Sequence, residues 1–170
     1  MDAATEVKFD ALRNALYHSF RQRWLDFVNR MMSLIVVLSG AVAVSDLFGG
    51  FKYFALAASI FGALQLVYDF GGAAKEHSFL QQRFYAVIAD IEGNINPTEA
   101  TIAKWKADLV AIYGTEPPTF RALDAIAYNA AADALGTGYG IDISKFRYTL
   151  LKQLYPFNGT SFPAEKKLTI

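Results

Sequence analysis

The sequence predicts an all-α protein: a hairpin of two transmembrane helices whose long helices extend into a cytoplasmic helical bundle. Three observations lead to this fold class. Residues 31–70 carry only Asp46, Lys52 and Asp69 as charged side chains, although charged residues make up 19% of the 170-residue chain. The flanking segments repeat apolar side chains every three or four residues, which is the period of an amphipathic helix. No segment shows the alternating apolar and polar pattern of a half-buried strand.

The first predicted helix begins near Glu6 and continues into the first span without a break. No proline lies between Glu6 and Phe48, and Gly40 is the only glycine there. Residues 1–30 are therefore expected to form a cytoplasmic amphipathic helix that leads into a transmembrane helix at 31–48. The apolar face predicted for this helix consists of Phe9, Leu12, Leu16, Phe20, Trp24, Phe27 and Met31.

The second span is predicted at residues 51–70, after a turn at Gly49-Gly50. The two runs hold 18 to 20 residues each, or roughly 27–30 Å as α-helices, just enough to cross a hydrocarbon core. The competing interpretation is a buried helical hairpin in a soluble protein. Membrane crossing is favoured because the charges lie at the edges of the runs and aromatic side chains bracket them, as at headgroup depth.

Basic residues set the expected orientation of the spans. The turn carries Lys52 alone. The opposite flanks carry Arg21, Arg23, Arg30, Lys75 and Arg83. Because cytoplasmic flanks are enriched in Lys and Arg, both termini are expected in the cytoplasm and the turn outside. The N-terminal segment is charged and has no apolar core, so it is not expected to be a cleavable signal peptide.

Residues 71–155 are predicted to form a cytoplasmic helical domain. A kink is expected at Gly71-Gly72, and the helix that follows should end near Gly93. The apolar face predicted for it is Leu80, Phe84, Val87, Ile88 and Ile91. The next helix is expected to start with Asn96 as its cap, Pro97 at its first position and Glu99 completing a capping box. Its predicted apolar face is Ile102, Trp105, Leu109 and Ile112.

Two more helices are expected after the break at Thr115-Glu-Pro-Pro118. The first should end at Gly136, and Asp142 or Ser144 should cap the second. The apolar face predicted for the first is Phe120, Leu123, Ile126 or Ala127, Ala130 and Ala134. The C-terminal tail, residues 156–170, has no clear period and is expected either to be disordered or to dock on a partner.

The sequence offers no catalytic constellation. Its 16 basic and 16 acidic residues give zero net charge without a basic stripe, which argues against nucleic-acid binding. The absence of cysteine excludes disulfides and thiol chemistry. The only histidines, His18 and His77, fall on different predicted helices, and a solvated or capping role is expected for each. We therefore expect no enzyme activity, no cofactor and no metal site.

A stripe of small and polar residues follows one face of each predicted span. The stripe comprises Ala58, Gly62, Gln65 and Asp69 in the second span, and Ser39, Ala43 and Asp46 in the first. The spacing places each set on one side of a helix. Two interpretations stay open. The residues line a pore, which requires an oligomer because two helices cannot enclose a conduit, or they pack against another helix with Gln65 hydrogen-bonded across the contact.

Three segments around the spans follow a recognisable order. They are Tyr17-His-Ser-Phe-Arg-Gln-Arg-Trp24, Lys75-Glu-His-Ser-Phe-Leu-Gln-Gln-Arg-Phe84, and Thr115-Glu-Pro-Pro-Thr-Phe-Arg-Ala-Leu-Asp124 with Tyr128-Asn129. With them, roughly residues 10–136 resemble the SLATT family, the two-transmembrane effector domains associated with SMODS nucleotidyltransferases and SLOG sensors in bacteria. The family-like cytoplasmic residues are Glu116, Pro117, Pro118, Leu123 and Asn129.

The resemblance implies a pore-forming effector of a bacterial anti-phage or conflict system, a multi-pass protein of the inner membrane. Such an effector oligomerises and permeabilises the membrane when a nucleotide-linked sensor is activated. The partners implied are the lipid bilayer, further copies of the chain, and a nucleotide second messenger or a sensor or nucleotidyltransferase protein. Two alternatives stay open: a membrane-anchored helical adaptor that presents Trp105 and the Glu116–Pro118 region to partners, and a soluble helical bundle with an interaction role.

Overall fold

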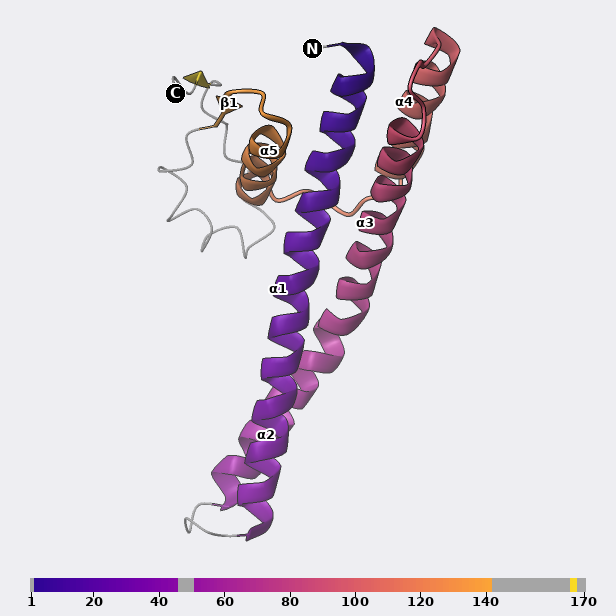
Figure 1. The fold of residues 1–170 in the computed structure, drawn as a ribbon. Coiled ribbons are helices and arrows are strands. Elements are labelled where there is room, and N and C mark those ends of the chain that lie inside the picture. The colour runs from indigo at the N-terminus through magenta and orange to yellow at the C-terminus, as the bar shows by residue number, and fades with distance from the viewer. Residues whose placement is uncertain (1, 46–50, 142–165, 168–170) are drawn as a thin grey trace. The chain divides into compact units, whose positions relative to one another are not determined.

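A computed structural model of the chain describes residues 2–45, 51–141 and 166–167. These residues are helical apart from short connections and one pair of two-residue strands (Figure 1). The elements are α1 (Ala3–Ser45), α2 (Phe51–Tyr68), α3 (Phe70–Glu92), α4 (Glu99–Tyr113), α5 (Arg121–Leu135), β1 (Tyr139–Gly140) and β2 (Lys166–Lys167). The all-α fold class is confirmed. The turn expected at Gly49-Gly50 and the helix expected after Asp142 or Ser144 lie outside the described residues.

The chain divides into two compact units, and α1 contributes residues to both. The terminal unit comprises Met1–Phe20 and Ser78–Ile170. The central unit comprises Arg21–His77. Each unit has its own contacts and is described by itself.

The central unit pairs the second part of α1 with α2. The two helices run in opposite directions, because Gln65 of α2 bonds to Ser33 whereas Gly71, further along the chain, approaches the earlier residue Asn29 (Figure 1). Two long helical stretches, Ala3–Val44 and Lys52–Glu92, are apolar enough to cross a membrane by length and composition. Only 6% of the apolar window of the first stretch and 0% of the second is buried in the chain.

The break between α2 and α3 lies at Asp69 rather than at the predicted Gly71-Gly72. Asp69 has a positive φ of 38°, and α2 ends one residue before it. An aspartate tolerates this left-handed conformation because its short side chain bonds to the nearby backbone. Both glycines lie inside the first turn of α3.

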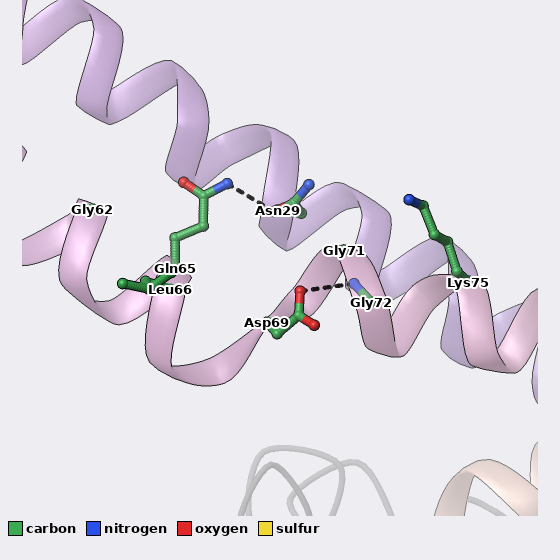
Figure 2. A pocket seen from close by; sticks show the side chains of 8 residues that line it. All are labelled: Asn29, Gly62, Gln65, Leu66, Asp69, Gly71, Gly72 and Lys75. Carbon is green, nitrogen blue, oxygen red and sulfur yellow. Dashed lines mark hydrogen bonds between the residues drawn. The ribbon is translucent and has the colours of Figure 1, made fainter.

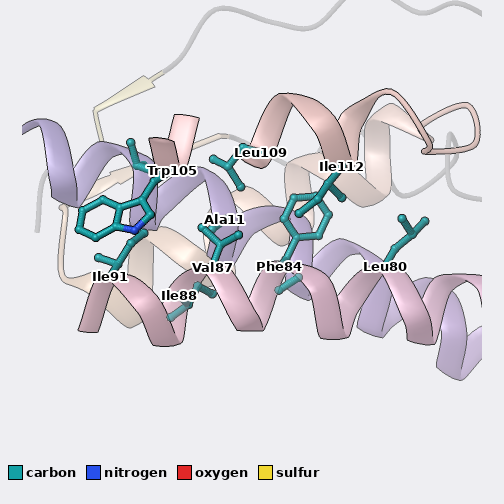
Figure 3. Close-up of a cluster of buried hydrophobic side chains, with 11 residues drawn as sticks. Ala11, Leu80, Phe84, Val87, Ile88, Ile91, Trp105, Leu109 and Ile112 are labelled. Carbon is teal, nitrogen blue, oxygen red and sulfur yellow. The ribbon is translucent and has the colours of Figure 1, made fainter. Parts of the chain in front are cut away.

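The terminal unit has a hydrophobic core formed by α1, α3 and α4 (Figure 3). The core residues are Val7, Ala11, Ala15, Leu80, Phe84, Val87, Ile88, Ile91, Trp105, Leu109 and Ile112. The predicted apolar faces of α3 and α4 are thereby confirmed. Its largest side chains, Trp105 and Phe84, are both 0% exposed, and burial of one such side chain contributes about 1.5–3 kcal/mol.

The predicted apolar face of α1 is largely wrong, although its Leu12 packs against the core. Val7, Ala11 and Ala15 enter the core, whereas Phe9, Leu12, Leu16 and Phe20 are only half-buried and Trp24, Phe27 and Met31 are exposed. Apolar residues occur on two adjacent rows of this helix, and both rows satisfy the spacing rule. The row with the alanines faces α3 because small side chains leave room for the larger Leu80 and Phe84.

The face of α5 and the start of α4 also differ from their predictions. In α5 the buried residues are Ala122, Ala125, Ala127, Ala131 and Ala132, and Ala134 is exposed. Small side chains again let the helix pack closely. The cap of α4 is Thr98, not Asn96, because the Thr98 hydroxyl accepts a hydrogen bond from the Thr101 N–H at 3.2 Å. Asn96 and Thr98 are both residue types that cap helices, and the structure uses Thr98.

The other helix ends are as predicted. α3 ends at Glu92, directly before Gly93, and Gly136 caps α5 with a left-handed φ of 62°. Only a short piece of the tail is described: Lys166–Lys167 pairs antiparallel with Tyr139–Gly140, with Tyr139 opposite Lys167. The rest of the tail lies outside the described residues.

Candidate functional site

Three polar side chains meet between α1 and α2 in the central unit. The side-chain nitrogen of Gln65 donates hydrogen bonds to Asn29 Oδ1 and to Ser33 Oγ, both at 2.8 Å. Figure 2 shows the Gln65 amide pointing from α2 toward Asn29 on α1. All three side chains are half-buried. We name Asn29, Ser33 and Gln65 the amide cluster.

Asp69, the last residue of the predicted stripe, bonds to the backbone of its own helix junction. It lies at the start of α3, where its Oδ1 accepts a hydrogen bond from the Gly72 N–H at 3.0 Å (Figure 2). A Cβ added to Gly72 would lie 2.1 Å from Asp69 Oδ2, so a larger residue at this position would displace the carboxylate. Asp69 therefore caps α3, and its negative charge lies at the positive end of the helix dipole.

An open pocket of about 730 Å³ joins the amide cluster to the Asp69 cap. It is lined by Asn29, Gly62, Gln65, Leu66, Asp69, Gly71, Gly72 and Lys75 (Figure 2). Three residues of the predicted stripe thus come together. The pocket offers two side-chain amides, one carboxylate and one ammonium group. These groups can form hydrogen bonds with water or with a polar ligand, but they include no nucleophile paired with a general base. Within residues 2–45, 51–141 and 166–167, no group of three potential metal ligands occurs.

The remaining stripe residues are more dispersed. Ser39 and Ala43 of α1 and Ala58 of α2 are half-buried, but they do not line this pocket. Asp46 lies outside the described residues. A Cβ added to Gly62 would meet no atom within 4 Å. No neighbouring atom of the same chain therefore requires a glycine at this position.

The family-like segment before α5 is bonded to other helices of the terminal unit. His18 is 0% exposed, its ring stacks on Phe84 at 5.7 Å, and its Nε2 lies 3.3 Å from Glu116 Oε1. The Phe120 N–H donates to the Tyr17 hydroxyl at 3.0 Å. Pro117 is half-buried and Pro118 is exposed. The segment is held by α1 through both of these polar contacts.

Two further contacts fix α5 and the residues after it. Arg13 of α1 forms a bidentate ion pair with the Asp124 carboxylate. Burial alone would lower the Arg13 pKa, but the hydrogen bonds and charge of Asp124 and the charge of Asp10 raise it above its usual value. The Asn129 side chain forms two hydrogen bonds with the Ile141 backbone. Its Nδ2 donates to the Ile141 carbonyl at 2.8 Å, and its Oδ1 accepts from the Ile141 N–H at 2.7 Å. Leu123 is half-buried on the same helix.

The expectation that the two histidines are solvated is wrong. His18 and His77 are buried, with 0% and 6% exposure, rather than solvated. Trp105 is 0% exposed, and its Nε1 donates to Asp90 Oδ2 at 2.8 Å. That hydrogen bond, together with Lys104, lowers the Asp90 pKa. The His18 ring contacts the rings of Tyr17 and Phe84 while its Nε2 still reaches Glu116, and periodicity alone does not reveal such a site.

Sequence reasoning missed Asn29 and Ser33. They are spaced by four residues, so they lie on one side of α1, and this spacing was the available signal. No protein-family model, curated protein or solved structure matches the chain, so the interpretation of these sites rests on their own geometry.

Proposed function

We propose that this protein is a pore-forming effector of the bacterial inner membrane. The observation that carries the proposal is the amide cluster, a group of polar side chains between two helices whose apolar windows are 6% and 0% buried. Polar side chains within membrane-spanning segments usually face a helix bundle or a water-filled cavity. Apolar surface this exposed is costly in water and favourable in lipid.

The proposal includes a topology. The apolar part of α1 and α2 cross the bilayer as a hairpin, and the terminal unit forms a helical bundle in the cytoplasm. The basic residues on the flanks, opposite Lys52 at the turn, support cytoplasmic termini. The exposed Trp24 and Phe27 fit the inner headgroup region.

The resemblance of residues 10–136 to the SLATT family supports the biological role. On this basis the protein is not an enzyme. It acts in an anti-phage or conflict system, oligomerises and permeabilises the membrane when a nucleotide-linked sensor is activated. Its partners are lipid, further copies of the chain, and a second messenger or a sensor or nucleotidyltransferase protein.

The first prediction tests this function with two variants of α2. We expect wild-type protein to depolarise bacteria that produce it and to release dye from reconstituted vesicles. Gln65→Leu should reduce both signals several-fold, because it removes the polar amide from the spans. Ser59→Ala should leak like the wild type, because Ser59 is exposed and its hydroxyl donates only to Ala55 O of its own helix, at 2.9 Å.

The vesicle measurement needs no cellular trigger if the protein is oligomeric when it is reconstituted. A chemically cross-linked oligomer that leaves the vesicles sealed would contradict the pore. The adaptor alternative is weaker, since Trp105 is fully buried and Glu116 is paired with His18. Trp105 and Glu116 are thereby engaged inside the protein, whereas Pro118 is exposed.

A further inference from the structure

We infer that the pocket face of the central unit is the contact between two copies of this chain, in which Gln65 of each copy hydrogen-bonds to Asn29 of the other. The inference rests on the proposed function in one respect: it places this face in a membrane. It goes further by naming the surface and the atoms through which copies associate.

Each of the two side-chain amides in the amide cluster leaves one polar atom unused. The Gln65 nitrogen uses its two hydrogens on Asn29 Oδ1 and Ser33 Oγ. Among the residues that the structure describes, Gln65 Oε1 accepts no hydrogen bond and Asn29 Nδ2 donates none. Lipid tails cannot pair with either atom, and an amide left unpaired in an apolar environment carries a desolvation cost of several kcal/mol.

A second copy of the same chain satisfies both atoms at once. A two-fold contact brings the same surface together from both sides, so a patch with one free donor and one free acceptor is self-complementary. The rim of the pocket adds a matching charge pair. Asp69 and Lys75 line it, both are exposed, and they carry opposite charges. Two such rims facing each other place each ammonium near the other copy's carboxylate.

The surface is also shaped for close approach. Gly62 lines the pocket, and a Cβ added there would meet no atom within 4 Å, so space lies open above this turn of α2. Small residues at helix contacts in lipid let backbones approach closely enough to hydrogen-bond. Large apolar side chains are exposed elsewhere on α2: Leu56, Ile60, Leu64 and Val67. Those apolar side chains can contact lipid, whereas the polar pocket face can contact the second copy.

The absence of cysteine allows a direct test in membranes. Gly62→Cys places a thiol on the pocket face, and Ala63→Cys places one on the next, exposed position of α2. With a short bifunctional thiol reagent, we expect several-fold more cross-linked dimer from Gly62→Cys than from Ala63→Cys. Equal yields would mean random collision and would overturn the inference.

A pair of substitutions in the Gly62→Cys background tests the hydrogen bonds. Asn29→Asp keeps the oxygen that Gln65 uses and removes the free N–H group, so the contact within one chain persists. Two membrane hydrogen bonds of average strength correspond to about an eightfold change in association, which is the expected loss of cross-linking. Ser33→Ala, which removes a contact within the chain but neither free atom, should cross-link like its parent. Unchanged cross-linking in Asn29→Asp would overturn the inference.

The contact between copies and the formation of a pore can be tested separately. Cross-linking that depends on Asn29, in a protein that leaves vesicles sealed, would support the contact and contradict pore formation. Leaking vesicles without preferred cross-linking at position 62 would support the pore and overturn this contact.

Discussion

At the scale of single residues, buried polar side chains join segments that are far apart in the sequence. His18 is a clear case, because it combines a ring stacked on Phe84 with a polar contact to Glu116. The Glu116 side chain is only 13% exposed, so its carboxylate depends on this contact. The resemblance drew attention to Glu116 as a family-like residue, and its position in the structure gives it a role in stability.

We expect His18→Phe to destabilise the protein. Phenylalanine keeps an aromatic ring against Phe84 but leaves the Glu116 carboxylate without its partner. A buried group that loses its hydrogen bond costs about 1–3 kcal/mol, and denaturant unfolding in detergent measures the loss. Adding Glu116→Gln to this variant removes the unpaired charge and should recover part of the stability. A His18→Phe protein as stable as the wild type would show that the contact contributes nothing.

A second residue-scale prediction concerns Tyr113. Burial, followed by the charges of Asp10 and Glu116, raises its pKa to about 12 from an ordinary 10. The raised folded-state pKa gives a stabilisation that is fully present below pH 10 and is lost as the pH rises through about 12. In an ultraviolet titration a component that ionises near pH 12 should be absent from Tyr113→Phe. Identical late titration in that variant would contradict the assignment.

At the scale of elements, the junction of α2 and α3 depends on two neighbouring requirements. Asp69 must adopt a positive φ, and its carboxylate must reach the Gly72 N–H. Gly72 makes the second possible because it has no side chain in the way. The two conditions explain why a break occurs here within a long run of helical residues.

We expect Asp69→Ala to cost at least about 1 kcal/mol, the typical value of a lost helix cap, because it removes the carboxylate that accepts from the Gly72 N–H and because alanine is disfavoured at a positive φ. Asp69→Asn is the matched variant: asparagine tolerates a positive φ and caps equally well, so its stability should be close to wild type. Denaturant titration of the purified protein compares the two. An Asp69→Ala protein that unfolds together with Asp69→Asn and the wild type would contradict a role for the cap.

Elements with a single apolar row were predictable, and elements with two rows were not. α3 and α4 each have one such row, and their core faces follow directly from the sequence. α1 has two adjacent rows, so only the packing partner decides that Ala11 and Ala15 face inward. The same limit applies to the candidate site. Gln65 stood out within an apolar run, whereas Asn29 lies at the edge of the charged flank, where polar residues are ordinary.

At the scale of the whole molecule, the two tryptophans lie in contrasting environments. Trp24 belongs to the central unit and is 43% exposed, whereas Trp105 belongs to the core of the terminal unit and is 0% exposed. The proposed topology places Trp24 at the inner edge of the bilayer, because aromatic rings concentrate at headgroup depth. A soluble bundle would place both rings away from lipid.

This contrast makes the membrane assignment testable with two single-tryptophan variants. Trp105→Phe reports on Trp24 alone, and Trp24→Phe reports on Trp105 alone. In vesicles of brominated lipid, which quenches indole fluorescence on contact, we expect strong quenching of Trp24 and little quenching of Trp105. Quenching of neither ring would favour the soluble bundle. In Trp105→Phe the whole indole signal comes from Trp24, which belongs to the central unit.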